Sequence, residues 1–372
     1  MSLHIFILGR EPQISIAEIQ ACFPDCKLLA TTPQFLVAEK ITTTPQLTSL
    51  GGTPILGHVF AQTKQLEPAC LQHYLAQKFQ TATQKQNFGL LSFGFKREPN
   101  SRLLLTTKKF LKTKQIKTRF VNKNFQNLTT PVLEFEILRK KGVALIVAKT
   151  PKQIFYAEVL AVQPFRELAK RDYAKPSRDA RVGMLPPKLA QILLNLTLGD
   201  LPNQTVYDPF CGTGTILVEA GLKQHQLIGS DLEPRLVAAT RQNLAAVNLK
   251  AELFQHDATQ KIARKFPFVV TEGLLGPPLN QEPRPQVQTK IFANLTKLYL
   301  KFFQNLQATK VGITFPFFAS GQNPATCLAP KILPLLKKYG WHNTLKQRLL
   351  YKRPQQVVGR EIVILRPRGL LI

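Results

Sequence analysis

The 372-residue chain has little cysteine and little acidic charge, and it lacks long apolar runs. Its five cysteines and six histidines show neither a C-x-x-C pair nor the spacing of metal ligands. We therefore expect no disulfide framework and no bound metal. No apolar stretch approaches the roughly 20 residues of a membrane-spanning helix, which argues against a membrane partner. Scattered, unpaired cysteines make the reducing cytoplasm the expected location.

Acidic residues are scarce, because 22 Asp and Glu accompany 50 Lys and Arg, and the net charge is +28. Such an excess predicts a polyanionic partner, for which nucleic acid is the first candidate. The charge concentrates between Lys85 and Lys123, where eleven residues are basic and only Glu98 is acidic. We predict that this segment binds RNA through six cations: Lys108, Lys109, Lys112, Lys117, Arg119 and Lys123.

The order of apolar and polar residues divides the chain into an N-terminal unit (1–75), a basic unit (76–168), a linker (169–182) and a C-terminal domain (183–372). In the first unit, Ser15 with Glu18 three residues later has the spacing of a capping box and predicts a helix start. Strands around that helix predict a small α+β unit. The C-terminal domain, which is the longest part, is predicted to be an α/β domain with a parallel, doubly wound sheet. Its expected strands are 205–207, 226–229, 251–254 and 266–271, with helices starting at Thr215 and Pro234.

A glycine-rich turn follows the first of these strands and opens a helix. Gly212 and Gly214 lack Cβ atoms, so they permit a tight turn and close approach of a ligand to the backbone. Asp231 lies nineteen residues after Gly212 at the end of the next strand. An acidic residue at this position accepts hydrogen bonds from the ribose hydroxyls of a bound nucleotide. Asp257, after the third strand, is suited to contact an adenine edge.

The ligand of this turn is expected to be an adenosine cofactor without a pyrophosphate. A dinucleotide fingerprint needs a third glycine three positions after Gly214, and Leu217 stands there. A nucleoside-triphosphate loop is also excluded, since no Gly-Lys-Ser/Thr follows.

The run DPFCGTGTILVEAGL, residues 208–222, resembles motif I of THUMP-containing RNA methyltransferases, especially the archaeal-type tRNA guanosine N2-methyltransferases. The run MLPPKLA at 184–190 is similar to the segment preceding that family's methyltransferase sheet, and HIFILGREPQISIAEI resembles its N-terminal unit. The resemblance implies a Rossmann-like methyltransferase domain with a final antiparallel hairpin, preceded by ferredoxin-like and THUMP units. It implies S-adenosylmethionine as cofactor and tRNA as partner.

The resemblance also assigns roles to individual residues. Asp208, Gly212 and Gly214 would surround the methionine part of S-adenosylmethionine, with Phe210 in the same cofactor site. Asp231 would take the ribose hydroxyls, and Asp257 the adenine.

The resemblance weakens after the fourth strand, where the family carries Asp-Pro-Pro-Tyr and residues 272–279 read EGLLGPPL. In one alignment Glu272 replaces the Asp; in another, Gly276-Pro277-Pro278-Leu279 matches the motif without its acid and ring. We prefer the first, because Glu272 directly follows the strand. Glu272 is then the candidate catalytic residue that orients an exocyclic amino group, guanosine N2 above all. A stacking ring is expected from Phe315, Phe317 or Phe318.

Two other functions stay open from the sequence. The missing Pro-Pro-Tyr permits a non-catalytic RNA-binding protein that retains a methyltransferase fold. A DNA amino-methyltransferase shares the same motif pattern, although the basic N-terminal half argues against it. The C-terminal stretches 351–354 and 360–364 are expected to form a basic hairpin that is either solvated or in contact with RNA.

Overall fold

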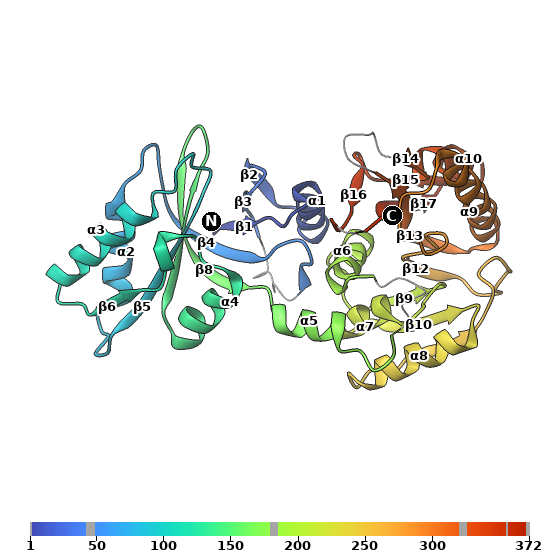
Figure 1. Ribbon diagram of the computed structural model, residues 1–372, viewed down its shortest axis with the longest axis horizontal. Coiled ribbons are helices and arrows are strands. Elements are labelled where there is room, and N and C mark those ends of the chain that lie inside the picture. The colour runs from blue at the N-terminus through green and yellow to red at the C-terminus, as the bar shows by residue number, and fades with distance from the viewer. Residues whose placement is uncertain (1, 42–48, 179–184, 320–325, 355, 370–372) are drawn as a thin grey trace. The chain divides into compact units, whose positions relative to one another are not determined.

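The computed structural model describes residues 2–41, 49–178, 185–319, 326–354 and 356–369. By their internal contacts these residues fall into two units (Figure 1). Unit 1 comprises residues up to 16 and 23–166, and unit 2 comprises 17–22 together with everything from residue 167. The predicted linker overlaps helix α5 (Phe165–Tyr173) and then enters residues 179–182, which lie outside the described residues.

The described part of unit 1 is built on one eight-stranded sheet. Strand β5 pairs in parallel with β6 and β7, and the other neighbours are antiparallel. Residues from both sides of position 75 belong to this one sheet, so the sheet is continuous across the expected boundary between the first two units. In spatial order the strands are β2 (Lys27–Thr31), β3 (Phe35–Glu39), β1 (Leu3–Ile7), β4 (Ile55–Thr63), β8 (Ile154–Val162), β7 (Val143–Lys149), β5 (Gln86–Phe93) and β6 (Thr118–Phe120).

Helices cover the sheet of unit 1 because their apolar stripes face it. Helices α2 (Pro68–Lys78) and α3 (Asn100–Thr113) share a core with β5 and β7. A second core contains residues of β1, β3 and the helical segment 130–140, which begins as α4 (Thr130–Val132). Helix α1 (Pro12–Cys22) starts three residues before Ser15, so the predicted cap was wrong. Proline suits a first helical position, and the Ser15 hydroxyl instead donates to the Gly52 carbonyl at 2.7 Å.

The described part of unit 2 is built on a nine-stranded sheet whose central path confirms the expected α/β fold. Strands β11, β10, β9, β12 and β13 are parallel, and β17 enters antiparallel between β13 and β15, which forms the final antiparallel hairpin. Two short strands, β14 and β16, pair beside it. The bounds are β9 (Thr205–Asp208), β10 (Gln226–Asp231), β11 (Glu252–Gln255), β12 (Phe266–Thr271), β13 (Ala308–Phe318), β14 (Thr326–Cys327), β15 (Trp341–Asn343), β16 (Leu349–Tyr351) and β17 (Val358–Pro367).

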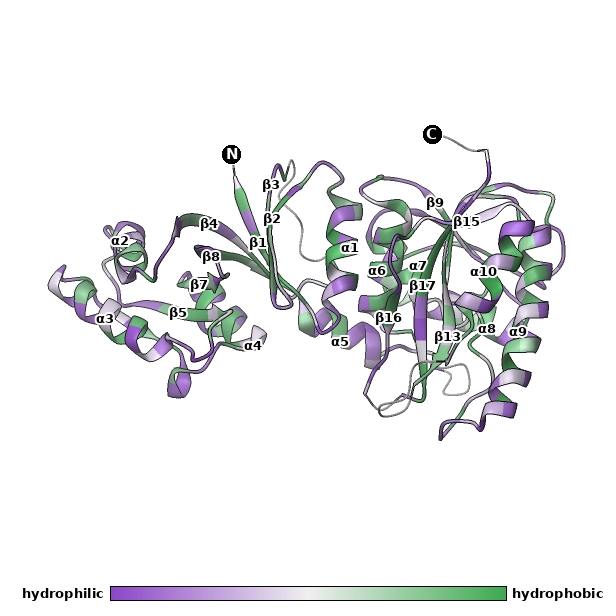
Figure 2. Cartoon of the chain, turned by 90° about the horizontal axis from the view of Figure 1, so that it is seen from above, coloured by the Kyte–Doolittle hydropathy of each residue, from purple (hydrophilic) through white to green (hydrophobic). Residues whose placement is uncertain are grey.

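Helices cover both faces of this sheet (Figure 1). Helices α9 (Pro285–Asn305) and α10 (Ala329–Lys338) bury an aromatic core with Val311 and its neighbours. Helix α6 (Pro187–Leu198) lies on the other face, because a Cβ at Gly312, next to Val311 in β13, would meet the Thr197 side chain. Helices α7 (Thr215–Leu222) and α8 (Pro234–Ala245) follow β9 and β10. Figure 2 shows both hydrophobic and hydrophilic residues around α9, as expected of a helix with one face on a sheet and the other exposed.

Candidate functional site

The carboxyl ends of the parallel strands in unit 2 surround a cavity of about 640 Å³. Ligands of open α/β sheets bind at this edge. Strands β9 and β10 end in Asp208 and Asp231, Asp257 follows β11, and Glu272 follows β12. Four acids that are far apart in the sequence therefore line one cavity. Phe210 and Gly212 line it as well.

The turn between β9 and α7 depends on two glycines in left-handed conformation. Gly212 has φ +53° and Gly214 has φ +80°. Residues that carry a Cβ atom rarely adopt such positive φ angles. A Cβ at Gly214 would also lie 2.8 Å from the Thr240 methyl group. The Thr240 hydroxyl donates to the Gly212 carbonyl at 2.8 Å, and Asn243 donates to the Thr213 carbonyl at 2.8 Å. Helix α8 thus fixes the turn, and Gly214 acts by close packing rather than by lining the cavity.

Asp208 is the most enclosed acid of the cavity, with 2% of its surface exposed. The Phe210 backbone N–H donates to its Oδ1 at 3.2 Å. Burial raises the pKa of Asp208 to about 7, and hydrogen bonds from Thr271 and Phe210 act in the opposite direction.

Asp231 and Asp257 are held by backbone amides at the ends of neighbouring strands. Gly212 N–H donates to Asp231 Oδ2 at 2.9 Å, and Glu233 N–H donates to Oδ1 at 3.0 Å. Burial raises the pKa of Asp231. Asp257 accepts from the Thr259 N–H at 2.9 Å and from its hydroxyl at 2.8 Å, and the backbone hydrogen bond leads the lowering of its pKa. Each carboxylate oxygen has further acceptor capacity, which suits ligands that bring hydroxyl or amino donors.

Glu272 reaches the cavity wall already paired with a buried arginine. Arg360 Nε donates to Glu272 Oε1 at 2.5 Å, and Arg360 Nη1 donates to Gln356 Oε1 at 2.9 Å. The side chain of Arg360 is 4% exposed and that of Glu272 is 15% exposed. The expectation of a solvated or RNA-contacting hairpin at 360–364 was therefore wrong for Arg360. Sequence reasoning missed this pair because 88 residues separate its members.

The turn after β12 is fixed by side chains from other elements. Thr314 donates to the Glu272 carbonyl at 2.7 Å, and the fully buried Tyr299 donates to the Leu274 carbonyl at 2.6 Å. Gly273 has φ +72°, and a Cβ there would lie 2.5 Å from the Tyr299 hydroxyl oxygen. Both β13 and α9 thus hold Glu272 at its place on the cavity wall.

The phenylalanines expected to stack on a base are core residues. Phe315, Phe317 and Phe318 are 0%, 4% and 1% exposed and do not line the cavity. Phe318 stacks on Phe292 of α9 with ring centroids 5.4 Å apart. The prediction was wrong because successive residues of β13 point to opposite faces of the sheet and helices cover both faces. The rings are therefore packed in the core and do not reach the cavity.

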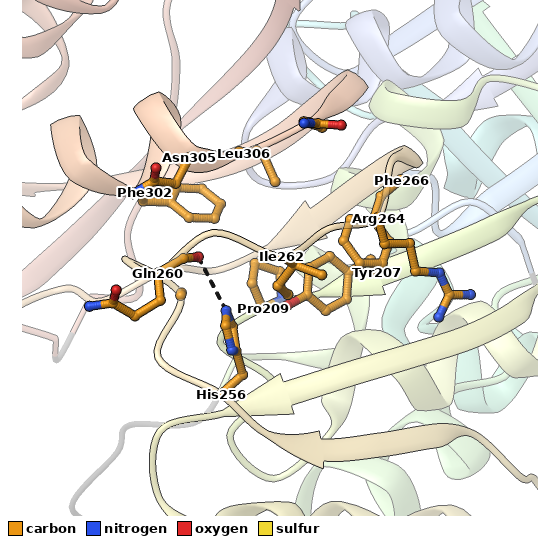
Figure 3. Close-up of a pocket in the computed structure, with 12 residues that line it drawn as sticks. Tyr207, Pro209, His256, Gln260, Ile262, Arg264, Phe266, Phe302, Asn305 and Leu306 are labelled. Carbon is orange, nitrogen blue, oxygen red and sulfur yellow. Dashed lines mark hydrogen bonds between the residues drawn. The ribbon is translucent and has the colours of Figure 1, made fainter.

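A second hollow lies beside the cofactor-sized cavity and shares Pro209, His256 and Ala258 with it (Figure 3). The close-up places His256 opposite Gln260, whose carbonyl oxygen is 3.2 Å from His256 Nε2. Its volume is about 10 Å³, which suits roughly one water molecule and no part of a cofactor.

The six predicted RNA-binding cations are all exposed in unit 1. Lys108 and Arg119 lie on the two sides of the sheet edge formed by β6. Lys108 on α3 approaches the Phe120 ring at 5.5 Å, on the face that α3 covers. Arg119 precedes Phe120 in β6, so its side chain points to the opposite face. A hydrogen bond from Lys140 is the main cause that lowers the pKa of Glu136, and the nearby charges of Arg119 and Lys123 lower it further. The lysines of α3 and Arg119 are therefore brought to one edge, not to one face.

The sequence also predicts no bound metal and no membrane partner. No group of three or more metal-ligating side chains occurs among them. Among the helices in the described ranges, none is both long enough and apolar enough to cross a membrane.

A comparison with known families finds a match within unit 2. The family described as "RMKL-like, methyltransferase domain" matches residues 176–272. The match spans the glycine-rich turn and ends at Glu272.

The relatives include a tRNA methyltransferase. The tRNA (guanine(10)-N2)-dimethyltransferase of Methanothermobacter thermautotrophicus is 38% identical over 96 residues, which are 25% of this chain and 28% of the relative. The chain thus aligns with less than a third of that relative's length.

Solved structures resemble the whole chain in fold. TrmN from Thermus thermophilus superposes with a TM-score of 0.54 at 15% identity, over 98% of this chain and 99% of TrmN. A putative methyltransferase complexed with SAH superposes with a TM-score of 0.51 at 11% identity, over 100% of this chain and 99% of that one. The full-length likeness confirms the expected fold, a C-terminal methyltransferase-like α/β domain preceded in the chain by an N-terminal α+β region.

Proposed function

We propose that the chain is an S-adenosylmethionine-dependent methyltransferase that modifies an exocyclic amino group in tRNA, with guanosine N2 as the target. The observation that carries this proposal is the convergence of Asp208, Asp231, Asp257 and Glu272 on one cavity. The tRNA and the target atom follow from the relative's name. They are supported by the net charge of +28.

The residues of the cavity fit the cofactor. The glycine turn brings backbone N–H groups and the start of α7 to the cavity wall, which suits the cofactor's carboxylate. Asp231 would accept from the ribose hydroxyls and Asp257 from the adenine amino group. When bound, S-adenosylmethionine supplies an electrophilic methyl group.

Glu272 would orient the acceptor. A base amino group is a poor nucleophile because its lone pair is conjugated with the ring, so its hydrogens must be held and its lone pair aimed. The carboxylate of Glu272 would accept one of those hydrogens. Arg360 fixes Oε1, and Thr314 and Tyr299 fix the backbone on which Glu272 lies. Such support matters, since a misplacement of about 1 Å can cost roughly a hundredfold in rate.

Arg360 also favours a second candidate function. A carboxylate engaged by an arginine has less capacity for an amino group, and no phenylalanine of β13 stacks at the cavity. These two observations support a protein that binds cofactor and tRNA without methyl transfer. That candidate predicts full binding of both and no turnover.

Turnover by the wild type separates the two candidates, and Glu272→Gln then tests whether Glu272 orients the amine. If Glu272 orients the amine, methyl transfer to unmodified tRNA falls by about a hundredfold or more, while affinity for S-adenosylmethionine stays within about twofold. The control is Glu252→Gln, an exposed acid paired with Arg264, which should retain activity. A Glu272→Gln enzyme as active as this control removes Glu272 from the catalytic site.

A DNA target is tested by competition. The basic unit 1 supports RNA, so tRNA should displace duplex DNA at matched salt. Preference for the duplex would replace tRNA with DNA as the substrate.

A further inference from the structure

The opposite edge of the unit 2 sheet carries a small cavity that the proposed methyl transfer does not use. Its volume is about 80 Å³. It lies at the amino ends of β12 and β13 and beside the last residues of β17, whereas Glu272 follows the other end of β12. Its wall consists of Thr197, Leu198, Leu201, Phe268, Thr309, Lys310 and Arg366.

Strand register places two cations next to each other in this cavity. Phe268 of β12 pairs with Lys310 of β13. Val311 pairs with Leu365 in the antiparallel ladder of β13 and β17, so the next step brings Lys310 opposite Arg366. Residues directly opposite in a ladder point to the same face. The cavity lining agrees, because both side chains belong to it together with Thr197 of α6.

The two charges have no acidic partner in the described ranges. The other arginines that β16 and β17 bring near the sheet are paired, as in Arg348 with Glu361 and Arg360 with Glu272. No described carboxylate forms an ion pair with Lys310 or Arg366. Burial and the charge of Arg366 lower the pKa of Lys310 to about 8. Like charges opposite each other destabilise a sheet, so this pair has an energetic cost that an anion would remove.

A histidine continues the same row. His342 of β15 pairs with Arg366 in the ladder of β15 and β17. Its Nε2 atom is buried and has no hydrogen-bond partner among the described residues. Buried polar atoms of this kind are uncommon in folded proteins. Its position beside Arg366 places a third polar group near the two cations.

We propose that Lys310 and Arg366 bind a phosphate group in this cavity. A water molecule needs about 10–15 Å³ of such space, so 80 Å³ suits a tetrahedral oxyanion and excludes a nucleoside. Arginine offers a planar pair of donors and lysine a point charge, both of which suit phosphate oxygens. The phosphate group is either free inorganic phosphate or part of an RNA backbone. The site does not depend on the proposed methyl transfer.

Inorganic phosphate is the probe for the first test. Calorimetric titration and thermal unfolding are measured on the full chain, with chloride at equal ionic strength as reference. Phosphate should bind and raise the Tm of the wild type. Lys310→Met and Arg366→Met should each weaken binding at least tenfold, whereas Lys337→Met, which removes an exposed lysine of α10, should not.

The same variants provide a readout in the absence of phosphate. Because each removes one of two like charges, Lys310→Met and Arg366→Met should unfold at the wild-type temperature or above it in chloride. A merely structural lysine would instead lower the Tm on removal. If one of the two variants does not fold, the other variant and Arg366→Gln are compared with the wild type instead.

Titration with tRNA distinguishes the two sources. Equal tRNA affinity of wild type and variants assigns the site to free phosphate. A weaker tRNA affinity in both variants, with phosphate competing in the wild type, assigns it to the RNA backbone. Wild-type protein that binds no phosphate, or variants that bind it as well as the wild type, overturns the proposal.

Discussion

Asp208 combines two demands at one residue. Its position at the end of β9 places it on the cavity wall, and the same position buries it almost completely. A buried carboxylate loses solvation, and hydrogen bonds from Thr271 and the Phe210 N–H offset part of this loss. Burial of this carboxylate at the proposed cofactor site therefore has a cost in folding stability.

Replacing Asp208 with Asn should make this cost visible as a pH dependence. Burial raises the pKa of Asp208 from 3.8 to about 7, so the folded state binds the proton more tightly than the unfolded state. Its contribution to the free energy of unfolding then falls as pH rises from about 4 to about 7. Relative to wild type, Asp208→Asn should gain stability across that window. Urea denaturation at pH 4.5 and pH 8 measures this, and a stability difference independent of pH contradicts it.

Single residues also mark the limit of sequence reasoning. The spacing of Gly212, Gly214 and Asp231 predicted a cofactor turn, because a turn between strand and helix is a local structure. Arg360 could not be found in this way. It approaches Glu272 only because β17 inserts beside β13, and such an insertion is decided by sheet topology.

At the scale of elements, the short strands of unit 2 were predictable because buried parallel strands are continuous apolar runs. The strand expected at 266–271 matches β12 residue for residue. The failures occurred where tertiary contacts override local preference. Ser15 has the chemistry of a cap but lies inside α1, and Phe315 follows a strand pattern whose two faces are both covered.

The turn after β12 is the element on which the proposed chemistry depends. Tyr299→Phe removes one hydroxyl that holds this turn through the Leu274 carbonyl. Loss of one such hydrogen bond should lower the free energy of unfolding by about 1 kcal/mol. Methyl transfer should fall further than this loss of stability explains, because Glu272 loses its fixed position.

Denaturant unfolding and activity are to be measured on the same Tyr299→Phe sample. Tyr339→Phe is the control, since Tyr339 is 47% exposed and should tolerate the change. Unchanged activity in Tyr299→Phe would separate the turn from the reaction.

At the scale of the whole molecule, the net charge of +28 predicts binding that weakens steeply with salt. The sequence located the densest run of cations, between Lys85 and Lys123 in unit 1, but not the arrangement of these cations in space. The described cations lie around the edge at β6, because neighbouring residues of a strand point to opposite faces. A backbone wrapping this edge fits the arrangement better than one lying on a flat face.

Combined replacement of Lys108, Lys109 and Lys112 with Ala should weaken tRNA binding. If each lysine contacts one phosphate, the slope of log affinity against log salt should fall by about 2–3. The control removes equal charge from unit 2 at Lys337, Lys338 and Lys346, all of them exposed. Filter binding at several salt concentrations measures both, and equal slopes for the two variants would refute a specific role for α3.

The central claim is methyl transfer from S-adenosylmethionine to a base amino group in tRNA. Its most direct test incubates the purified chain with unmodified tRNA and isotopically labelled S-adenosylmethionine, followed by nucleoside mass spectrometry. We predict label in N2-methylguanosine. Label in another nucleoside would keep the enzyme class and change the target. Absence of label, with tRNA and cofactor both shown to bind, would contradict the claim and favour the binding protein.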